Sequence, residues 1–429
     1  MMERRIYDAL GEEIIWEVLP NGLTIAIVPR PGFTKKLAYF VTDFGAIHRT
    51  FRSQGEAYTA PAGVAHYLEH KMFDMPRRDV SAEFAALGAS VNAFTSFDMT
   101  AYYFGCTDHF SENLQLLLEF VSTGYFTDES VAKEQGIIGQ EIGMYEDNPE
   151  SKVFDLLMGN MYRNHPVTVP ILGTVDSIAR ITPQVLETCH KAFYRPDNML
   201  LCVVGDVDAE EVIAIAQKMT PAAPGPKPEV IRTWPEEMTC KESYQEATME
   251  VSMPMFQLGF KCEPLGWGEE AVRQELIGDL AAEALFGESS RLYLRLYEEG
   301  LIDSAFGGGF ETVEGMAMLT AFGDSDDPQA VLEAIMQEAE TLAQTGIPEE
   351  EFLRMKRSAM GRRIRGLDSF DSICFRICAY HFSGFDYFRF PEVYENLKCQ
   401  DIQDFLAQVA KPERCSMACI YPITQEETQ

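Results

Sequence analysis

Hydrophobic and polar residues alternate in short runs near the start of the chain and recur at helical spacing further along. Residues 14–28 hold two apolar-rich runs separated by Pro20-Asn21-Gly22, and an Asn-Gly pair in that position is typical of a β-hairpin. Other β-rich runs predict strands at residues 37–44, 90–95, 100–106 and 199–204. Apolar residues three or four apart predict helices at residues 62–72, 80–87, 110–123, 127–145 and 151–161.

A proline-rich stretch ends this first half of the chain. Between residues 220 and 235 the periodicity is lost, and the stretch contains Pro221, Pro224, Pro226, Pro228 and Pro235. Such a composition is typical of a semi-rigid linker. The order of elements then starts again, with predicted helices at 271–286 and 291–299, strands at 305–310 and 317–322, and helices at 328–344 and 347–366.

This repetition predicts an α+β protein of two similar halves, each a mostly antiparallel sheet packed with helices, facing each other as a clamshell. We expect an N-terminal catalytic, metal-binding domain at residues 1–220, a Pro-rich linker at 221–239, and a homologous C-terminal domain without a metal site at 240–429.

Composition narrows the class of protein. The chain has 429 residues, 46% of them hydrophobic, which is enough to bury large cores, and its formal net charge of -32 would repel nucleic acid. No apolar stretch approaches twenty residues, and no apolar run follows the basic residues near the N-terminus, so we expect neither a membrane span nor a leader, and a cytoplasmic location. The ten cysteines form no Cys-x-x-Cys pair and are expected to be buried thiols.

The most informative motif is His66-Tyr67-Leu68-Glu69-His70, which has the form H-x-x-E-H. Residues four apart stack on one face of a helix, so His66 and His70 can bind one metal ion, and Glu69 borders that face. This order is the reverse of H-E-x-x-H and is known from zinc peptidases called inverzincins. The alternative interpretation is a pair of structural histidines on a helix.

A catalytic zinc usually has three protein ligands, so a carboxylate is needed from elsewhere in the chain. The helix predicted at 127–145 offers several acids, among which Glu134 and Glu141 are seven apart and share one face. Helical glutamates are more often exposed and inert, so this pair alone is weak evidence. The predicted chemistry is metal-assisted hydrolysis with Glu69 as the general base; zinc is expected, although such ligands also accept manganese or cobalt.

The motif and its surroundings resemble the pitrilysin/insulinase family of zinc metallopeptidases, in which H-x-x-E-H is followed by a distant glutamate with another glutamate seven residues before it. Here Glu141 comes 71 positions after His70. Further segments are similar to the family, namely Gly88–Thr95, His165-Pro166, Ile171–Thr174 and Phe193–Met199. Within the family, the segment Leu68–Phe73 is most similar to bacterial YmfH-like members.

The resemblance implies roles for individual residues. It makes His66, His70 and Glu141 the zinc ligands. It makes Glu69 the general base and Glu134 a supporting acid of the catalytic site. It also implies that residues 92–95 form an edge strand that pairs with a peptide substrate, so that Asn92, Ala93 and Phe94 bind substrate and Phe94 lines the pocket for the residue after the cut. The alternative is that these residues are an ordinary hairpin edge.

One departure from the family concerns the second half. Active members carry an arginine and, seven residues later, a tyrosine that act on the substrate; Arg295 is the nearest match, but Ile302 stands in place of the tyrosine. A partner chain could supply the missing group, either as a homodimer or as a heterodimer with a motif-poor homologue.

The leading interpretation is therefore a zinc endopeptidase that acts on peptides or flexible polypeptide segments. Two alternatives stay open. One is a non-catalytic peptide-binding factor for maturation or assembly that keeps the peptidase fold. The other is a processing enzyme dedicated to one modified peptide or one protein leader.

Overall fold

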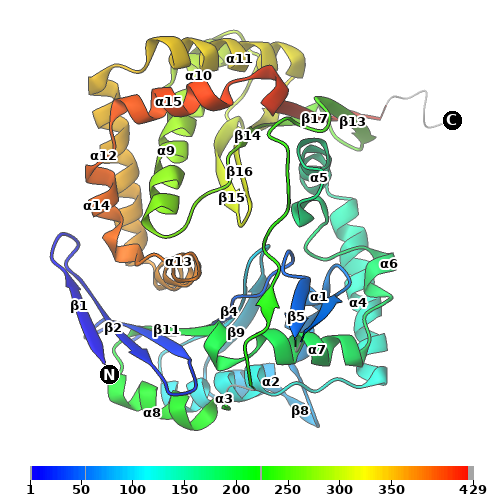
Figure 1. Cartoon of the computed structure of the whole chain (residues 1–429), viewed down its shortest axis with the longest axis vertical. Helices are drawn as coiled ribbons and strands as arrows, with labels where there is room; N and C mark the ends of the chain where they lie inside the picture. The colour runs from blue at the N-terminus through cyan, green and yellow to red at the C-terminus, as the bar shows by residue number, and fades with distance from the viewer. Residues whose placement is uncertain (1, 54, 223–224, 424–429) are drawn as a thin grey trace. The chain divides into compact units, whose positions relative to one another are not determined.

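The computed structural model describes residues 2–53, 55–222 and 225–423, which form two compact units (Figure 1). Unit 1 gathers the residues up to Ile142 together with Val169–Ile231 and Ile364–Arg389. Unit 2 gathers Gly143–Thr168, Arg232–Arg363 and the described residues from Phe390 onward. Neither unit is continuous in sequence. Of the predicted linker, residues 223–224 lie outside the described part of the chain.

Unit 1 is built on a sheet whose strands run in the order β1-β2-β3-β11-β4-β10-β9. Only the pair of β3 and β11 is parallel, so the sheet is mostly antiparallel, as predicted. The strands are β1 Glu3–Tyr7, β2 Glu12–Val18, β3 Thr24–Pro29, β4 Lys36–Thr42, β9 Ser90–Thr95, β10 Thr100–Cys106 and β11 Met199–Gly205.

Helices cover both faces of this sheet. Met199, Leu201 and Val203 of β11 join the core formed with the helices of the first half, whereas Cys202 between them is buried on the opposite face, against α13. The helices of unit 1 are α1 Val64–Met72, α2 Val80–Ala86, α3 Phe110–Ser122, most of α4 Asp128–Glu146, α6 Val175–Ile178, α7 Pro183–Phe193, α8 Ala209–Met219 and α13 Phe370–Phe382.

Smaller elements complete unit 1. A three-stranded sheet has the order β12-β5-β6, and a two-stranded one pairs β7 with β8. Their bounds are β5 Thr50–Ser53, β6 Glu56–Thr59, β7 Asp74–Met75, β8 Arg78–Asp79 and β12 Glu229–Val230. The short 3-10 helices of this unit are η2 Pro196–Asn198, η3 Gly366–Asp368 and η4 Tyr387–Arg389.

Unit 2 repeats the centre of unit 1. Its sheet has the order β13-β17-β14-β16-β15, which matches β3-β11-β4-β10-β9 strand by strand, including the single parallel pair. The strands are β13 Tyr244–Met249, β14 Met255–Cys262, β15 Gly307–Val313, β16 Met316–Asp324 and β17 Cys415–Pro422. The two similar α+β halves predicted from the sequence are therefore confirmed.

Helices pack around the sheet of unit 2 as they do in unit 1. They are α5 Pro149–Met161, α9 Glu269–Phe286, α10 Arg291–Glu298, α11 Pro328–Thr345, most of α12 Glu349–Arg365, α14 Phe390–Glu395 and α15 Cys399–Val409. The 3-10 helices are η1 Pro166–Thr168 and η5 Pro412–Arg414.

Each half of the sequence contributes one helix to the unit built by the other half. Helix α13 packs on β11 and β4 of unit 1, and α5 packs on β17, β14 and β13 of unit 2. In unit 2, Asn160 on α5 donates a buried hydrogen bond to the carbonyl of Met417, and Gly259 on β14 leaves room for Met161. These helices occupy corresponding places, since α5 follows α4 and α13 follows α12.

The start of helix α1 is held by a loop from later in unit 1. Gly63, at the N-cap, has a φ of 85°, and a Cβ there would lie 2.3 Å from the carbonyl oxygen of Leu172. In return, the Ser177 hydroxyl donates a hydrogen bond of 2.9 Å to the carbonyl of Ala62. The segment Ile171–Thr174 therefore fixes where α1 begins, through the contact of Leu172 with Gly63.

Replacing Gly63 by alanine is expected to destabilise unit 1. The left-handed backbone and the contact with Leu172 should together cost about 1–3 kcal/mol of unfolding free energy. Thermal unfolding followed by circular dichroism measures this as a lower Tm. Gly136→Ala in α4 is the matched control, because nothing lies within 4 Å of its Cβ position and a helical glycine costs about 1 kcal/mol relative to alanine. A Gly63→Ala protein as stable as the control would refute the assignment.

Candidate metal centre

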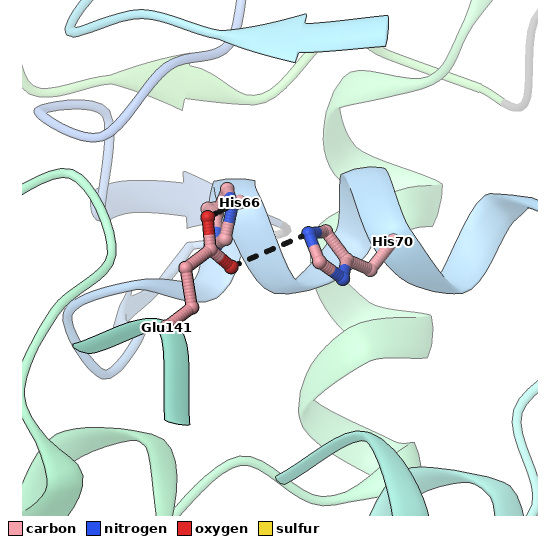
Figure 2. A group of neighbouring side chains, drawn as sticks. All are labelled: His66, His70 and Glu141. Atoms are coloured by element: carbon pink, nitrogen blue, oxygen red, sulfur yellow. Dashed lines mark ion pairs between the residues drawn. The ribbon is translucent and has the colours of Figure 1, made fainter. Parts of the chain in front are cut away.

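The two histidines of the motif lie side by side on helix α1. Their ring centroids are 4.6 Å apart, and both rings project from the same side of the helix toward Glu141 (Figure 2). Tyr67 and Leu68, between them, are fully buried in the core of unit 1. The helix is anchored by these apolar neighbours, so the histidine side chains are presented from a rigid element.

Helix α4 supplies the third donor. One carboxylate oxygen of Glu141 lies 3.5 Å from Nε2 of His66, and the other lies 3.7 Å from Nε2 of His70. The donor atoms of the three residues all lie within 4.8 Å of one another. A tetrahedral zinc ion with bonds of about 2.0–2.2 Å separates its ligands by about 3.4 Å, so the spacing fits such an ion. Among the described residues, this is the one such group of three or more donors.

Two side chains of α1, Tyr67 within the motif and Lys71 directly after it, attach this helix to α4. The buried Tyr67 hydroxyl donates a 2.5 Å hydrogen bond to the carbonyl of Val131, and the ammonium group of Lys71, which is also buried, donates to the carbonyl of Ser130 at 3.3 Å. Lys71 also pairs with Asp74. Sequence reasoning missed both roles. Tyr67 and Lys71 are four apart, as the histidines are, and this spacing was the available signal.

Glu134 supports His70 from the first half of α4. Its Oε1 lies 3.0 Å from Nδ1 of His70, so an ionised Glu134 accepts the proton of Nδ1 and leaves the lone pair of Nε2 facing Glu141. Burial acts to lower the pKa of His70, but the hydrogen bond to Glu134 and the charges of Glu69, Glu134 and Glu141 outweigh it and raise that pKa. The hydrogen bond with His70 is the main reason that the pKa of Glu134 is lowered.

His66 is arranged differently. Its Nε2 faces Glu141, and the contact between them is the main cause of a lowered pKa at Glu141. Its Nδ1 is buried and, among the described residues, has no hydrogen-bond partner. His66 therefore lacks the supporting carboxylate that His70 has. Both histidines direct Nε2 toward Glu141. Only His70 has a second acid, Glu134, beside its Nδ1 to fix which ring nitrogen carries the proton.

Glu69 lies beside the donor group without joining it. Its side chain is buried, with 9% of the residue exposed, and its Oε2 accepts a 2.6 Å hydrogen bond from the hydroxyl of Thr95. Thr95 is the last residue of β9. One carboxylate oxygen is thus fixed by a neutral donor. The role of Thr95 was not identified from the sequence.

Strand β9, which contains Asn92, Ala93 and Phe94, is the last strand of the unit 1 sheet and pairs on one side with β10. An edge strand offers backbone groups to a further strand. Phe94 packs at ring-centroid distances of 6.3 Å from Tyr103 and 5.9 Å from Phe375. The residues predicted to bind substrate therefore lie on the strand that ends at Thr95, the partner of Glu69.

The residues singled out in the second half belong to unit 2. Arg295 is exposed on α10. Ile302, which stands where a tyrosine was expected, is 5% exposed and part of the apolar interior. In this unit the residue at the expected tyrosine position is therefore a core residue. Separately, the described helices include none with the length and apolar character needed to cross a membrane.

Two family models match the chain. Residues 54–175, which contain the histidines and glutamates of the donor group, match "Insulinase (Peptidase family M16)". Residues 180–359, which contain Arg295 and Ile302, match "Peptidase M16 inactive domain". The match to the inactive domain covers the half in which no H-x-x-E-H motif was found.

Individual relatives extend over almost the whole chain. The uncharacterized zinc protease YmfH of Bacillus subtilis is 36% identical over 426 residues, covering 97% of this chain and 98% of that protein. The crystal structure of an M16-like peptidase from Alicyclobacillus acidocaldarius superposes with a TM-score of 0.92 at 32% identity, covering 98% and 99% of the two chains.

A more distant relative is the beta subunit of the mitochondrial-processing peptidase of Caenorhabditis elegans. It is 28% identical over 206 residues, covering 48% of this chain and 44% of that subunit. The family thus includes chains named as subunits. The resemblance to the insulinase family and to its YmfH-like members is confirmed, and the chain belongs to peptidase family M16.

Proposed function

We propose that this chain is a zinc-dependent endopeptidase that hydrolyses peptides or flexible polypeptide segments. The observation that carries the proposal is the meeting of three donors from α1 and α4, with a further, unligated carboxylate beside them. Two imidazoles and a carboxylate are a common donor set of catalytic zinc, which keeps one position open. Relatives named zinc proteases support the choice of metal.

When bound, zinc would supply Lewis acidity, which lowers the pKa of a water molecule to about 7 and polarises a carbonyl group. Glu69 would take a proton from the attacking water and return it to the leaving amine. The hydrogen bond from Thr95 would keep the carboxylate of Glu69 in place for both transfers. His66, His70 and Glu141 would hold the metal, and Glu134 would orient His70.

Strand β9 would bind the peptide substrate by adding it as a further strand of the sheet. In that arrangement the backbone of Asn92 and Ala93 would pair with the substrate, and Phe94 would contact a side chain next to the cut. The direct connection from β9 to Glu69 through Thr95 supports this role, because it links the edge strand to the proposed base. Arg295, on α10, is proposed as a further substrate contact.

A second candidate function is a peptide-binding maturation or assembly factor, or one subunit of a heteromeric peptidase. The burial of Ile302 and the match to an inactive domain favour it. The position of Glu69 favours catalysis, because a binding protein needs no buried base beside its metal ligands. We also propose a cytoplasmic location, since all ten cysteines are free thiols.

Glu69→Gln is expected to keep zinc and to lose cleavage by about two to four orders of magnitude, because the amide can still accept the Thr95 hydrogen bond but cannot carry a proton. Zinc content is measured by elemental analysis and cleavage with a library of quenched fluorescent peptides. His66→Ala is the companion variant and should lose both zinc and cleavage. Glu69→Gln cutting as fast as the unchanged chain would rule out Glu69 as the base.

Glu134→Gln is expected to weaken zinc binding by about 10- to 100-fold, because the amide no longer compels His70 to carry its proton on Nδ1. Competition with a chromogenic chelator measures the affinity. Cleavage should recover when zinc is added in excess, which separates a positioning role from a role in proton transfer. Exposed Glu129 on the same helix, changed to Gln, is the control and should leave the affinity unchanged. Equal affinities for the two variants would contradict the role.

The isolated chain is expected to be less active than its mixture with a motif-poor homologue, if a partner supplies the group absent at Ile302. Size-exclusion chromatography with light scattering gives the oligomeric state, and the peptide library gives the activity of each fraction. Full activity of the monomeric fraction would exclude both the homodimer and the heterodimer as requirements.

A further inference from the structure

A cavity of about 350 Å³ lies in unit 2 between helix α9, strand β15 and helix α15. Its volume is within the range of small-ligand sites. The apolar part of its wall is formed by Leu265 before α9, Ile277 of α9, Phe310 of β15, and Phe405 and Val409 of α15. All of these belong to unit 2, and none is part of the metal centre. The established family and the proposed function leave this cavity unused.

The cavity is shaped by fixed contacts. Phe310 lies over Gly278, where a Cβ would come within 2.3 Å of its ring, so the ring takes the place that a side chain on α9 would fill. Phe310 and Phe405 meet edge to face at 5.7 Å. Gln274 accepts a 2.8 Å hydrogen bond from the backbone of Gly266, which fixes the loop before α9. The wall is therefore largely formed in advance of any ligand.

Four carboxylates stand around the apolar wall, from Glu263, Glu270, Asp401 and Asp404, with one guanidinium, that of Arg273. Arg273 is engaged, since it pairs with Asp401 at 2.8 Å, and Glu263 pairs with Arg414 at 3.3 Å. Among the described residues, no lysine or arginine pairs with Glu270 or Asp404. Two exposed carboxylates thus line the same cavity as the aromatic rings without a cation of their own.

We propose that this cavity binds the basic side chain of a polypeptide, an arginine or a lysine. An ammonium or guanidinium group on an apolar stem matches both parts of the wall. The stem packs on Phe310 and Phe405, whose ring faces also attract a cation. The charged head donates charge-assisted hydrogen bonds to the carboxylates of Glu270 and Asp404. The proposal does not depend on the metal centre or on peptidase activity.

Trp267 provides a way to observe binding. It lies in the loop between Leu265 and Glu270, two residues that line the cavity, and its side chain is 69% exposed. The protein has three tryptophans, of which Trp16 belongs to unit 1 and Trp234 packs on His165. A change in indole fluorescence that is lost in Trp267→Phe therefore reports on this loop.

The test titrates the full-length chain with Nα-acetyl-arginine methylamide and follows both fluorescence and heat. Saturable binding is expected at millimolar ligand. Nα-acetyl-citrulline methylamide, which has the same shape without the charge, should bind at least about tenfold more weakly, because it cannot form charge-assisted hydrogen bonds with the two carboxylates. The double variant Glu270→Gln/Asp404→Asn should lose affinity for the arginine compound to the same degree.

The control removes the same charge elsewhere in unit 2. Glu333→Gln/Glu350→Gln changes two exposed acids of α11 and α12, outside the cavity, and should leave the affinity within about twofold. If the two double variants weakened binding equally, the overall negative charge of the protein would account for the affinity, and the proposal would be overturned. Equal binding of the citrulline compound would do the same. So would binding of spermidine without binding of the arginine compound, because the occupant would then be a free polyamine.

Discussion

The junction of α1 with α4 is the contact on which the rest of the site depends. Helix α1 carries two donors and α4 carries the third, so a small shift of one helix along the other would separate them. Tyr67 and Lys71 prevent such a shift, because each donates to a backbone carbonyl in the first turns of α4. The same two turns of α1 therefore present the histidines on one face and, on another, the side chains of Tyr67 and Lys71 that bind α4.

The burial of Lys71 shows how closely this junction is specified. An ammonium group without partners in the protein interior would cost several kcal/mol, so its pairing with Asp74 and the Ser130 carbonyl must persist for the fold to be stable. Helix α4 itself contains Gly136, Gly139 and Gly143, which lower its intrinsic helical stability. A helix of this composition gains its order from what it packs against, and here that includes α1 and the segment at the end of α6, where the carbonyls of Ile178 and Ile181 accept hydrogen bonds from Gln135.

The sequence alone indicates His66 and His70, because they are one helical turn apart and local periodicity places them on the same face. Glu141 required the family resemblance, since the choice among the acids of α4 depends on where that helix lies. Thr95 was missed because its contact with Glu69 joins segments 26 residues apart. Strand β17 was missed for a different reason: its run from Cys415 to Ile420 is buried on both faces and does not alternate cleanly. Strand β14 does alternate, with Phe256, Leu258 and Phe260 between Gln257, Gly259 and Lys261, so the sequence did contain a signal for it. Helix α13 was not predicted, and nothing in its local pattern indicates that the sheet of unit 1 is its partner.

The second unit shows what the same pair of helices does without a metal motif. There α12 takes the place of α4, and α9 precedes the edge strand β15 as α1 and α2 precede β9. Arg363 of α12 pairs with Glu275 and Asp279 of α9 at 2.6 and 2.9 Å, and Arg362 pairs with Glu283 at 2.9 Å. The three acids are spaced four residues apart along α9, and the two arginines are on α12. Direct ion pairs thus join the two helices in unit 2, whereas in unit 1 the imidazoles of α1 face the carboxylates of α4. At this shared helix contact the second helix carries arginines in unit 2 and glutamates in unit 1, which explains how a repeated fold contains a single candidate metal centre among its described residues.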